Sequence, residues 1–367
     1  MVNLRLRALA QGVSIGVVGL LSLSTALPAQ QHYKQTNLVS DTGVGGTQQD
    51  GNLVNAWGIS RGSATPWWVS DNGMGVATLY DGTGTARSLV VTIPAADSSK
   101  TGTPTGQIFN GTTDFQLVKD KPAVFLFATE DGTISGWNPG VLPTTAKIMV
   151  NTKGASVFKG LAVATINDSS AGATNYLYAA DFTGHVRVYD TNFHEVHLKG
   201  NAFQDERHHG YAPFNIQNIG GNLYVAFAKR GEGIDEAAGP GLGFVDVFSP
   251  TGRLLLRLES GKWFNAPWGL AQAPNDFGAY SHNILVGQFG SGEILAFDPV
   301  TGAFKGRLLD ATNKPITIDG LWAIAFGGGN SNSGPSTSLF FTAGPNDENN
   351  GLFGTITAIE NVLGGDH

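Results

Sequence analysis

Cysteine is absent from all 367 residues of the sequence. Without a thiol the chain can form no disulfide, no thiolate metal site and no cysteine-based catalytic centre. In an oxidising compartment its stability must therefore come from packing of the folded chain alone.

Charge is scarce as well: charged residues make up only 14% of the chain, and the formal net charge is -7 at pH 7. A net negative chain repels polyanions, and no basic stripe with interleaved aromatic residues is visible, so we expect no nucleic-acid partner. A sustained helical period is also missing beyond the first thirty residues. The 51 glycines and 21 phenylalanines instead fit closely packed sheets joined by many turns.

No hydrophobic run is long enough to cross a bilayer. Residues 1–29 carry Arg5 and Arg7, then an apolar run over residues 12–23, and end in Leu-Pro-Ala. This run of ~12 to 16 residues is shorter than the ~20 that a membrane span needs, and a small last residue suits signal peptidase. We expect a signal peptide over residues 1–29 and a secreted or periplasmic protein without a stable membrane anchor. A retained anchor is the alternative interpretation.

What the sequence does contain is a repeat, clearest in residues 283–309, NILVGQFGSGEILAFDPVTGAFKGRLL. Two strand-forming runs flank a Gly-Ser-Gly turn, and an Asp-Pro-Val-Thr-Gly turn leads into a third run. Residues 266–273 supply an innermost strand before them. Four consecutive strands of this kind are typical of one propeller blade.

Six copies of this unit can be aligned. Their second strands are predicted at 67–70, 124–129, 176–180, 223–228, 284–288 and 339–343, and their third strands at 77–80, 133–137, 185–189, 243–248, 294–297 and 355–359. The sixth copy lacks an outer strand, which residues 33–40 can supply. Closure removes exposed sheet edges and lets every blade bury its faces against neighbours. We therefore predict an all-β fold, a single six-bladed β-propeller domain over residues 30–367, with four-stranded antiparallel blades and a ring closed by the N-terminal strand.

Polar side chains end the second strands on the face where crossovers enter the next blade. In chain order these residues are Asp71, Glu130, Asp181, Lys229 and Gln288. Oxygen ligands from several blades suit a hard cation, so Asp71, Glu130 and Asp181 are candidate ligands for Ca²⁺. The other interpretation, which stays open, is that these acids cap turns.

The remaining rim residues are candidates for binding a ligand at the central mouth. Asn55, Asn265 and Asp319 lie near the starts of innermost strands, on the same face as Lys229 and Gln288. The insertion at residues 230–242 is either a cover for this mouth or a surface loop. Trp57, Trp268 and Trp322 recur beside innermost strands and are interpreted as packing between blades, with carbohydrate stacking as the alternative.

Other motifs predict no chemistry. The sequence has no Walker loop, dinucleotide fingerprint or nucleophile elbow, and no nucleotide, flavin or heme cofactor is indicated. His194 and His197 lack the helical spacing of a metalloprotease pair. His208 and His209, adjacent in an extended segment, would point in opposite directions and cannot readily chelate one ion.

Residues 266–271 (APWGLA), 283–288 (NILVGQ) and 292–298 (GEILAFD) together resemble the NHL-type six-bladed propellers. Residues 52–71, 211–217 and 264–270 are similar to a family of exported bacterial conserved-hypothetical proteins. The resemblance covers nearly all of the chain after the signal peptide and implies a propeller with no established activity. Six-bladed relatives include calcium-dependent lactonases and streptogramin-type lyases, but the lactonase glutamate of the first strand and the lyase histidines have no clear counterpart here.

Two classes of function follow. A binding module would hold a small-molecule or protein ligand at the central mouth. A calcium-dependent hydrolase, lactonase-like or esterase-like, would instead use a bound Ca²⁺ as Lewis acid and a carboxylate as base. The fold alone cannot choose between them, and the sequence predicts no oligomeric state.

Overall fold

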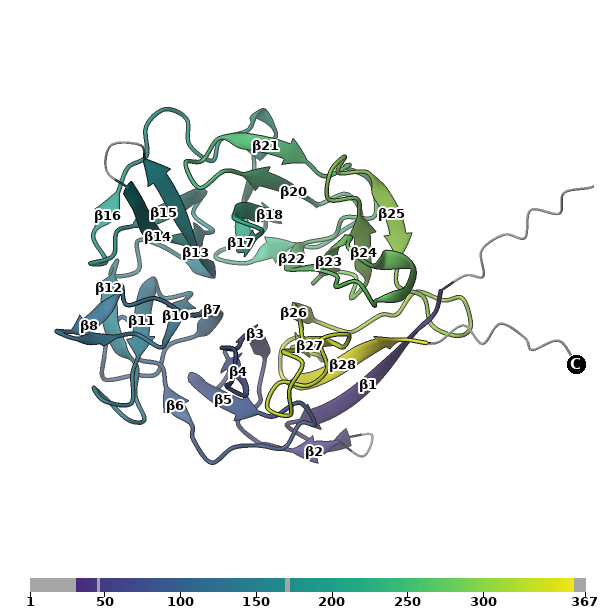
Figure 1. The fold of residues 1–367 in the computed structure, drawn as a ribbon, viewed down its shortest axis with the longest axis horizontal. Coiled ribbons are helices and arrows are strands. Elements are labelled where there is room, and N and C mark those ends of the chain that lie inside the picture. The colour runs from purple at the N-terminus through teal and green to yellow at the C-terminus, as the bar shows by residue number, and fades with distance from the viewer. Residues whose placement is uncertain (1–30, 45–46, 169–171, 360–367) are drawn as a thin grey trace, which may run out of the picture. The chain divides into compact units, whose positions relative to one another are not determined.

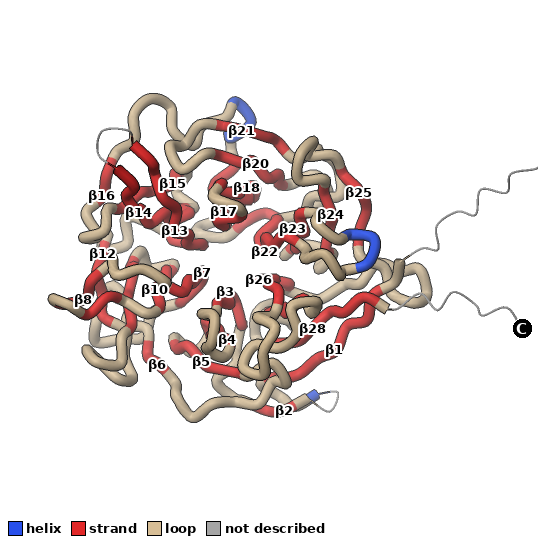
Figure 2. The backbone as a smooth tube through the Cα atoms, viewed as in Figure 1, coloured by secondary structure: helices blue, strands red, loops and turns tan. Residues whose placement is uncertain are grey.

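The computed structural model describes residues 31–44, 47–168 and 172–359, which form a six-bladed β-propeller (Figure 1). The predicted signal peptide lies outside these residues. Within them, no helix is long and apolar enough to cross a membrane. Helical structure consists mainly of short 3₁₀ turns at Glu206–His208 and Gly278–Tyr280, and strands surround the centre, with loops joining them (Figure 2).

Each blade is an antiparallel sheet whose strands follow one another from the axis outward. The first three blades are β3 (Ala56–Ser60), β4 (Trp67–Asp71), β5 (Val76–Tyr80) and β6 (Val91–Thr92); β7 (Pro104–Phe109), β10 (Phe125–Thr129), β11 (Thr133–Trp137) and β12 (Lys147–Asn151); and β13 (Phe158–Asp168), β14 (Gly172–Asp181), β15 (His185–Tyr189) and β16 (Glu195–Val196). A small hairpin of β8 (Gln116–Val118) and β9 (Lys121–Pro122) lies within the second blade's connections.

The fourth and fifth blades repeat this order. They are β17 (Tyr211–Ile219), β18 (Asn222–Arg230), β20 (Gly243–Phe248) and β21 (Leu254–Arg257), with the short β19 (Glu236–Ala237) paired to β18, and β22 (Pro267–Gln272), β23 (Ile284–Gln288), β24 (Ile294–Phe297) and β25 (Phe304–Arg307). The sixth blade contains β26 (Leu321–Phe326), β27 (Leu339–Ala343) and β28 (Leu352–Ala358). The predicted number and order of blades are confirmed.

The N-terminal strand β1 (Tyr33–Ser40) completes the sixth blade, as predicted. It pairs antiparallel with β28 from Tyr33 opposite Ala358 to Ser40 opposite Leu352, and β2 (Gln48–Gln49) pairs with it on the outside. Tyr33 is 1% exposed, and its hydroxyl donates a hydrogen bond to the Phe277 carbonyl at 3.0 Å. The ring is thus closed by strands from the two ends of the described chain.

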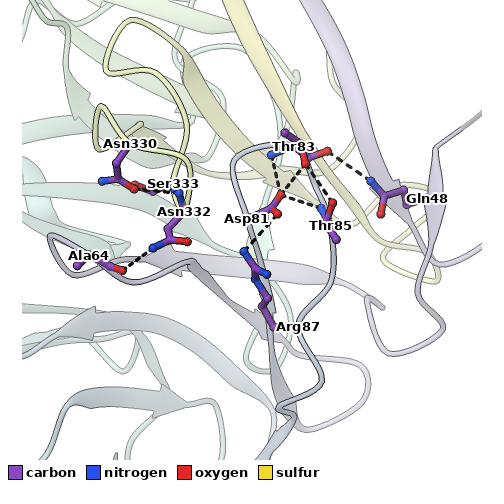
Figure 3. A network of polar contacts seen from close by, with 9 residues as sticks. All are labelled: Gln48, Ala64, Asp81, Thr83, Thr85, Arg87, Asn330, Asn332 and Ser333. Carbon is purple, nitrogen blue, oxygen red and sulfur yellow. Dashed lines mark hydrogen bonds and ion pairs between the residues drawn. The ribbon is translucent and has the colours of Figure 1, made fainter.

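Loops add polar contacts at the junction between the first and sixth blades (Figure 3). The Asn332 amide donates to the Ala64 carbonyl at 2.9 Å, and the Gln48 amide donates to the Thr83 carbonyl at 3.4 Å. Asp81 holds the turn that carries Thr83 by accepting from its backbone N–H at 2.9 Å and its hydroxyl at 2.7 Å. These bonds fix the loops on both sides of the junction.

The innermost strands share an irregularity that positions the axial side chains. In all six blades, the pairing between the innermost strand and the second strand shifts register near the start of the innermost strand. Such a bulge re-aims the side chain at the shift. The residues there, in blade order, are Trp57, Thr105, Lys159, Phe214, Trp268 and Trp322.

Candidate functional site

An aromatic cluster closes the propeller axis below the predicted mouth. Trp57, Phe214, Trp268 and Trp322 pack in one cluster although they come from the first, fourth, fifth and sixth blades. Trp57 stacks on Trp322 with ring centroids 3.7 Å apart, and Trp268 meets Trp322 edge-on at 5.9 Å. Side chains from blades on opposite sides of the ring can touch only near the axis. The tryptophans therefore pack there, and not only between adjacent blades as the repeat suggested.

In the third blade, Lys159 occupies the position that a tryptophan holds in the first, fifth and sixth blades. Its side chain is 1% exposed, and its Nζ lies 5.0 Å from the ring centroid of Trp57 and 5.9 Å from that of Phe214. Nζ pairs with Glu130 Oε1 at 2.6 Å. A buried ammonium is costly unless it is paired, and the surrounding ring faces add cation–π attraction.

Hydrogen bonds continue from this ion pair across the mouth. Glu130 Oε2 accepts from Asn72 Nδ2 at 3.0 Å, and Asn72 Oδ1 accepts from Asn55 Nδ2 at 3.3 Å. Asn55 also donates to Glu348 Oε2 and accepts at Oδ1 from Trp322 Nε1 at 2.9 Å. One connected network thus links the ion pair, the rim and the aromatic cluster.

Two further carboxylates, those of Glu236 and Glu348, lie close enough to Lys159 for its charge to lower their pKa values. Burial raises the pKa of Glu236 to about 7; Lys159 opposes the rise, while Glu348 and Asp235 add to it. Burial likewise raises the pKa of Glu348, against the hydrogen bond from Asn55. Glu236 belongs to the insertion at residues 230–242, where β19 pairs with the end of β18. This part of the insertion therefore belongs to the mouth.

The three predicted metal ligands have separate surroundings. Asp71 is fully buried, and burial raises its pKa well above the usual range. Asp181 Oδ2 accepts from Arg187 Nε at 2.6 Å, and its Oδ1 accepts from the Val157 and Thr183 backbone N–H groups. Within residues 31–359, leaving out the short undescribed segments, no group of three or more acidic or histidine side chains is arranged to hold a metal ion. Calcium binding stays a prediction, without a ligand cluster to support it.

Of the five residues predicted to bind a ligand, Asn55 lies in the axial network, and the others mainly order the rim. Gln288 is fully buried and accepts from the Asn265 backbone N–H at 2.8 Å. Asn265 Oδ1 accepts from the Gly239 N–H of the insertion at 2.6 Å. Lys229 lies with its Nζ 5.1 Å from the Tyr211 ring centroid, so Lys159, and not Lys229, supplies the ammonium beside Glu130.

Asp319, the fifth of these residues, fixes the loop that carries Glu348. Its Oδ2 accepts from the Asn346 backbone N–H at 2.8 Å. Asn346, Asp347 and Glu348 are consecutive and all have positive φ, at 59°, 50° and 63°. Left-handed conformations of non-glycine residues cost of order 1–3 kcal/mol each and gather at functional sites. Asp319 and Asn55 thus hold a strained loop over the mouth.

Sequence reasoning missed Lys159, Asn72, Glu236 and Glu348. One signal could have found Lys159, because Phe-Lys-Gly at 158–160 aligns with Ala-Trp-Gly at 56–58 and Pro-Trp-Gly at 267–269. A lysine in an aromatic repeat position is a departure that packing does not explain. Glu236 and Glu348 lie in segments without counterparts in the other blades, so the repeat could not place them.

Comparisons with known proteins agree with the fold. No family model matches the chain. Uncharacterized protein R648 of Acanthamoeba polyphaga mimivirus is 32% identical over 340 residues, which are 88% of this chain and 80% of that protein. Uncharacterized protein L690 of the same virus is 32% identical over 339 residues, 88% of this chain and 85% of that protein. A structural genomics protein of unknown function from Bacteroides thetaiotaomicron has a TM-score of 0.50 at 11% identity. The match covers 90% of this chain and 77% of that chain, and it shows a likeness of fold alone.

Proposed function

The chain belongs to the family of the mimivirus proteins R648 and L690, both described only as uncharacterized, and we propose from its own site that it is an exported protein that binds a small polar molecule at the propeller mouth. Export rests on the predicted signal peptide and on the resemblance to exported bacterial conserved-hypothetical proteins. The binding proposal rests on the polar network that surrounds the buried Lys159–Glu130 pair.

Five blades contribute to this network. Lys159 comes from the third, Glu130 from the second, Asn55 and Asn72 from the first, Glu236 from the fourth and Glu348 from the sixth. A few convergent polar groups above an aromatic floor, some with shifted pKa values, are typical of small-molecule sites. Packing of a propeller ring does not by itself require so many polar groups at its axis.

The charges indicate what kind of molecule fits. Lys159 offsets one of the three carboxylates of Glu130, Glu236 and Glu348, so the mouth carries an excess of acceptors and, when all are ionised, of negative charge. Burial raises the pKa values of Glu236 and Glu348 more than the charge of Lys159 lowers them. A ligand that carries an ammonium group together with hydroxyl groups would supply the missing donors.

A calcium-dependent hydrolase is the second candidate, and the same surplus of carboxylates is the observation that favours it. A hard cation could neutralise Glu236 and Glu348 and polarise a lactone or ester carbonyl. The two candidate functions differ in their need for calcium. The hydrolase would turn over an ester only when calcium is added, whereas the binding module would bind its ligand without it.

The first prediction concerns Glu348→Gln, which keeps the side-chain shape but removes one carboxylate from the mouth. We expect glucosamine, a probe with ammonium and hydroxyl groups, to quench the tryptophan fluorescence of the unmodified protein in a saturable way. Hydrogen bonds to charged groups contribute about 1.5–3 kcal/mol, so Glu348→Gln should weaken binding roughly tenfold or more, since about 1.4 kcal/mol is tenfold.

Asp347→Asn is the matched control, because it removes the same charge from the neighbouring exposed residue. It should change glucosamine binding less than about twofold, as expected of an exposed charge. Equal losses in both variants, or no saturable response of the unmodified protein, would contradict the proposed site. Calcium-dependent hydrolysis of a lactone or p-nitrophenyl ester that Glu348→Gln abolishes would favour the hydrolase instead.

A further inference from the structure

The opposite end of the axis holds two adjoining cavities of about 300 Å³ and 360 Å³. Both are lined by Arg61, Gln107, Gln217 and Phe326. Arg61 follows β3 and Phe326 ends β26, while Gln107 and Gln217 lie within β7 and β17. Trp268 of the aromatic cluster lines the first cavity, so the cluster lies between these cavities and the mouth. In Figure 1 the innermost strands β3, β7, β17 and β26, which carry or precede these residues, face the centre of the ring. The cavities are therefore separate from the site of the proposed function.

The charge at this end is opposite to that of the mouth. Among the described residues that line the two cavities, Arg61 is the one charged side chain, and no acid is present. Its neighbours are amides and apolar groups. No ion pair of Arg61 is found in the described part of the chain. An arginine in such surroundings is well suited to bind an anion.

Arg61 also bridges the first and sixth blades, and this role must be weighed against binding. Its Nε and Nη2 donate to the Phe326 carbonyl at 3.2 and 3.0 Å, and Nη2 donates to the Gly327 carbonyl at 2.9 Å. Nη1 makes no hydrogen bond to a described residue. Carbonyl groups orient the guanidinium but do not neutralise its charge, so the bridge accounts for its position and leaves an anion partner unassigned.

Gln107 lies on the same walls and has one side-chain oxygen without a hydrogen-bond partner in the described part of the chain. It is 6% exposed, and its Nε2 donates to the Gly58 carbonyl at 2.8 Å and to the Trp68 carbonyl at 2.7 Å. These two bonds fix the amide, and its Oε1 then has no partner among the described residues. A buried acceptor without a partner costs about 1–3 kcal/mol. Because this oxygen is itself buried, it belongs to the interior of the cavity wall, and a bound molecule does not reach it.

We propose that this end of the channel is a second binding site, for a small organic anion whose carboxylate or phosphate group pairs with Arg61. The cavity volumes lie at the small end of the range for ligand pockets, about 300–1,000 Å³. The guanidinium is held by the Phe326 and Gly327 carbonyls, and its Nη1 group remains for an anion, which arginine binds by charge-assisted hydrogen bonds.

Isothermal titration with malate, a small hydroxy acid, and with inorganic phosphate tests this site in the whole protein. We expect saturable binding of at least one of them, and tighter binding of malate would identify a carboxylate ligand, whereas tighter binding of phosphate would identify a phosphorylated one. Gln217→Glu places a negative charge on the exposed part of the wall without touching the junction, and it should weaken binding tenfold or more. Arg61→Met should abolish binding.

Gln204→Glu is the control, because it adds the same charge at an exposed residue that lines neither cavity, and it should leave binding unchanged. Glu348→Gln at the mouth should also leave it unchanged, which separates this proposal from the proposed function. No binding of either anion to the unmodified protein would overturn the second site. Binding that Gln217→Glu leaves as tight as before would overturn it too, even if Arg61→Met fails to fold.

Discussion

Lys159 shows how one residue can turn a packing position into a polar centre. In three blades the equivalent residue is a tryptophan of the axial cluster, and in the third blade the same bulge directs an ammonium into that cluster. Glu130 makes this tolerable by pairing at 2.6 Å, and the Trp57 ring face adds to it. Buried pairs of this kind contribute little net stability. The binding role proposed above would therefore account for Lys159 better than a role in folding.

Glu236 is expected to make stability depend on pH. Burial raises its pKa from 4.5 to about 7, so between these values the folded protein holds a proton that the unfolded chain has released. The free energy of unfolding should then fall as the pH rises through this window, by at most about 1.4 kcal/mol per pH unit. Glu236→Gln cannot ionise, so it should flatten the slope and stabilise the protein above pH 7.

Urea unfolding between about pH 5 and about pH 8 measures this slope. Glu232→Gln is the control, since Glu232 is exposed on the same insertion. Glu348, whose pKa is raised as well, should retain part of the slope in the Glu236→Gln variant. If Glu236→Gln and Glu232→Gln give the same slope as the unmodified protein, Glu236 is not the titrating group.

Site residues could be predicted from the sequence only where the repeat determines their place. Asn55 and Glu130 lie at strand ends fixed by the blade pattern, and both belong to the mouth network. Asp181 lies at an equivalent strand end, but Arg187 on the next strand pairs with it, a contact between side chains that strand order does not determine. The blade pattern thus predicts the backbone position of a residue at a strand end, but it does not predict which side chain that residue contacts.

At the scale of strands, the glycines beside the bulges determine how closely the blades meet at the axis. Gly58, Gly106 and Gly160 follow one another around the ring, and an added Cβ on any of them would lie 2.2–2.5 Å from an atom of the next blade. At this close approach, side chains form hydrogen bonds to the backbone of the next blade. The Thr105 hydroxyl, for example, donates to the Phe158 carbonyl at 2.7 Å. In the sequence, a glycine directly follows the residue at the bulge in the first, second, third and fifth blades.

Gly106→Ala should therefore destabilise the ring. Its Cβ would lie 2.5 Å from Gly160 Cα and 2.9 Å from the Leu161 nitrogen, and backbone atoms cannot rotate away. Overpacking of this kind costs about 1–3 kcal/mol, which differential scanning calorimetry would show as a lower melting temperature. Gly51→Ala is the control, because nothing lies within 4 Å of its added Cβ and its φ is not positive. Equal melting temperatures for the two variants would show that the blades can move apart at no cost.

The blade pattern could be predicted from the sequence because turns and alternating strands repeat in each copy. The predicted second strand at 284–288 and third strand at 294–297 agree with β23 and β24. The segments that complete the mouth could not be predicted in this way. The insertion carrying β19 and the loop of residues 344–351 each occur once, so no alignment within the chain shows where they fold.

For the whole molecule, closure depends on a strand far from its partner in the sequence. Such a contact is costly to form, because the chain must order the entire ring before β1 can pair with β28. Once formed, it pairs the edge of β28 along the strand. Hydrophobic packing across the same junction joins Val39 of β1 to Trp67 of the first blade and Phe340 of the sixth.

Removing β1 should consequently weaken the entire propeller. A chain without residues 30–41 loses seven residue pairs with β28 and the burial of Tyr33 and Val39. Each fully buried side chain of this size contributes about 1.5–3 kcal/mol, so the loss should be several kcal/mol of a total of about 5–15. A chain starting at Gln31 is the reference. Calorimetry should show a lower melting temperature for the shortened chain, and a synthetic peptide of residues 31–41 should restore part of it by pairing with the open edge of β28. A shortened chain that melts with the reference would show that the sixth blade is stable without its outer strand.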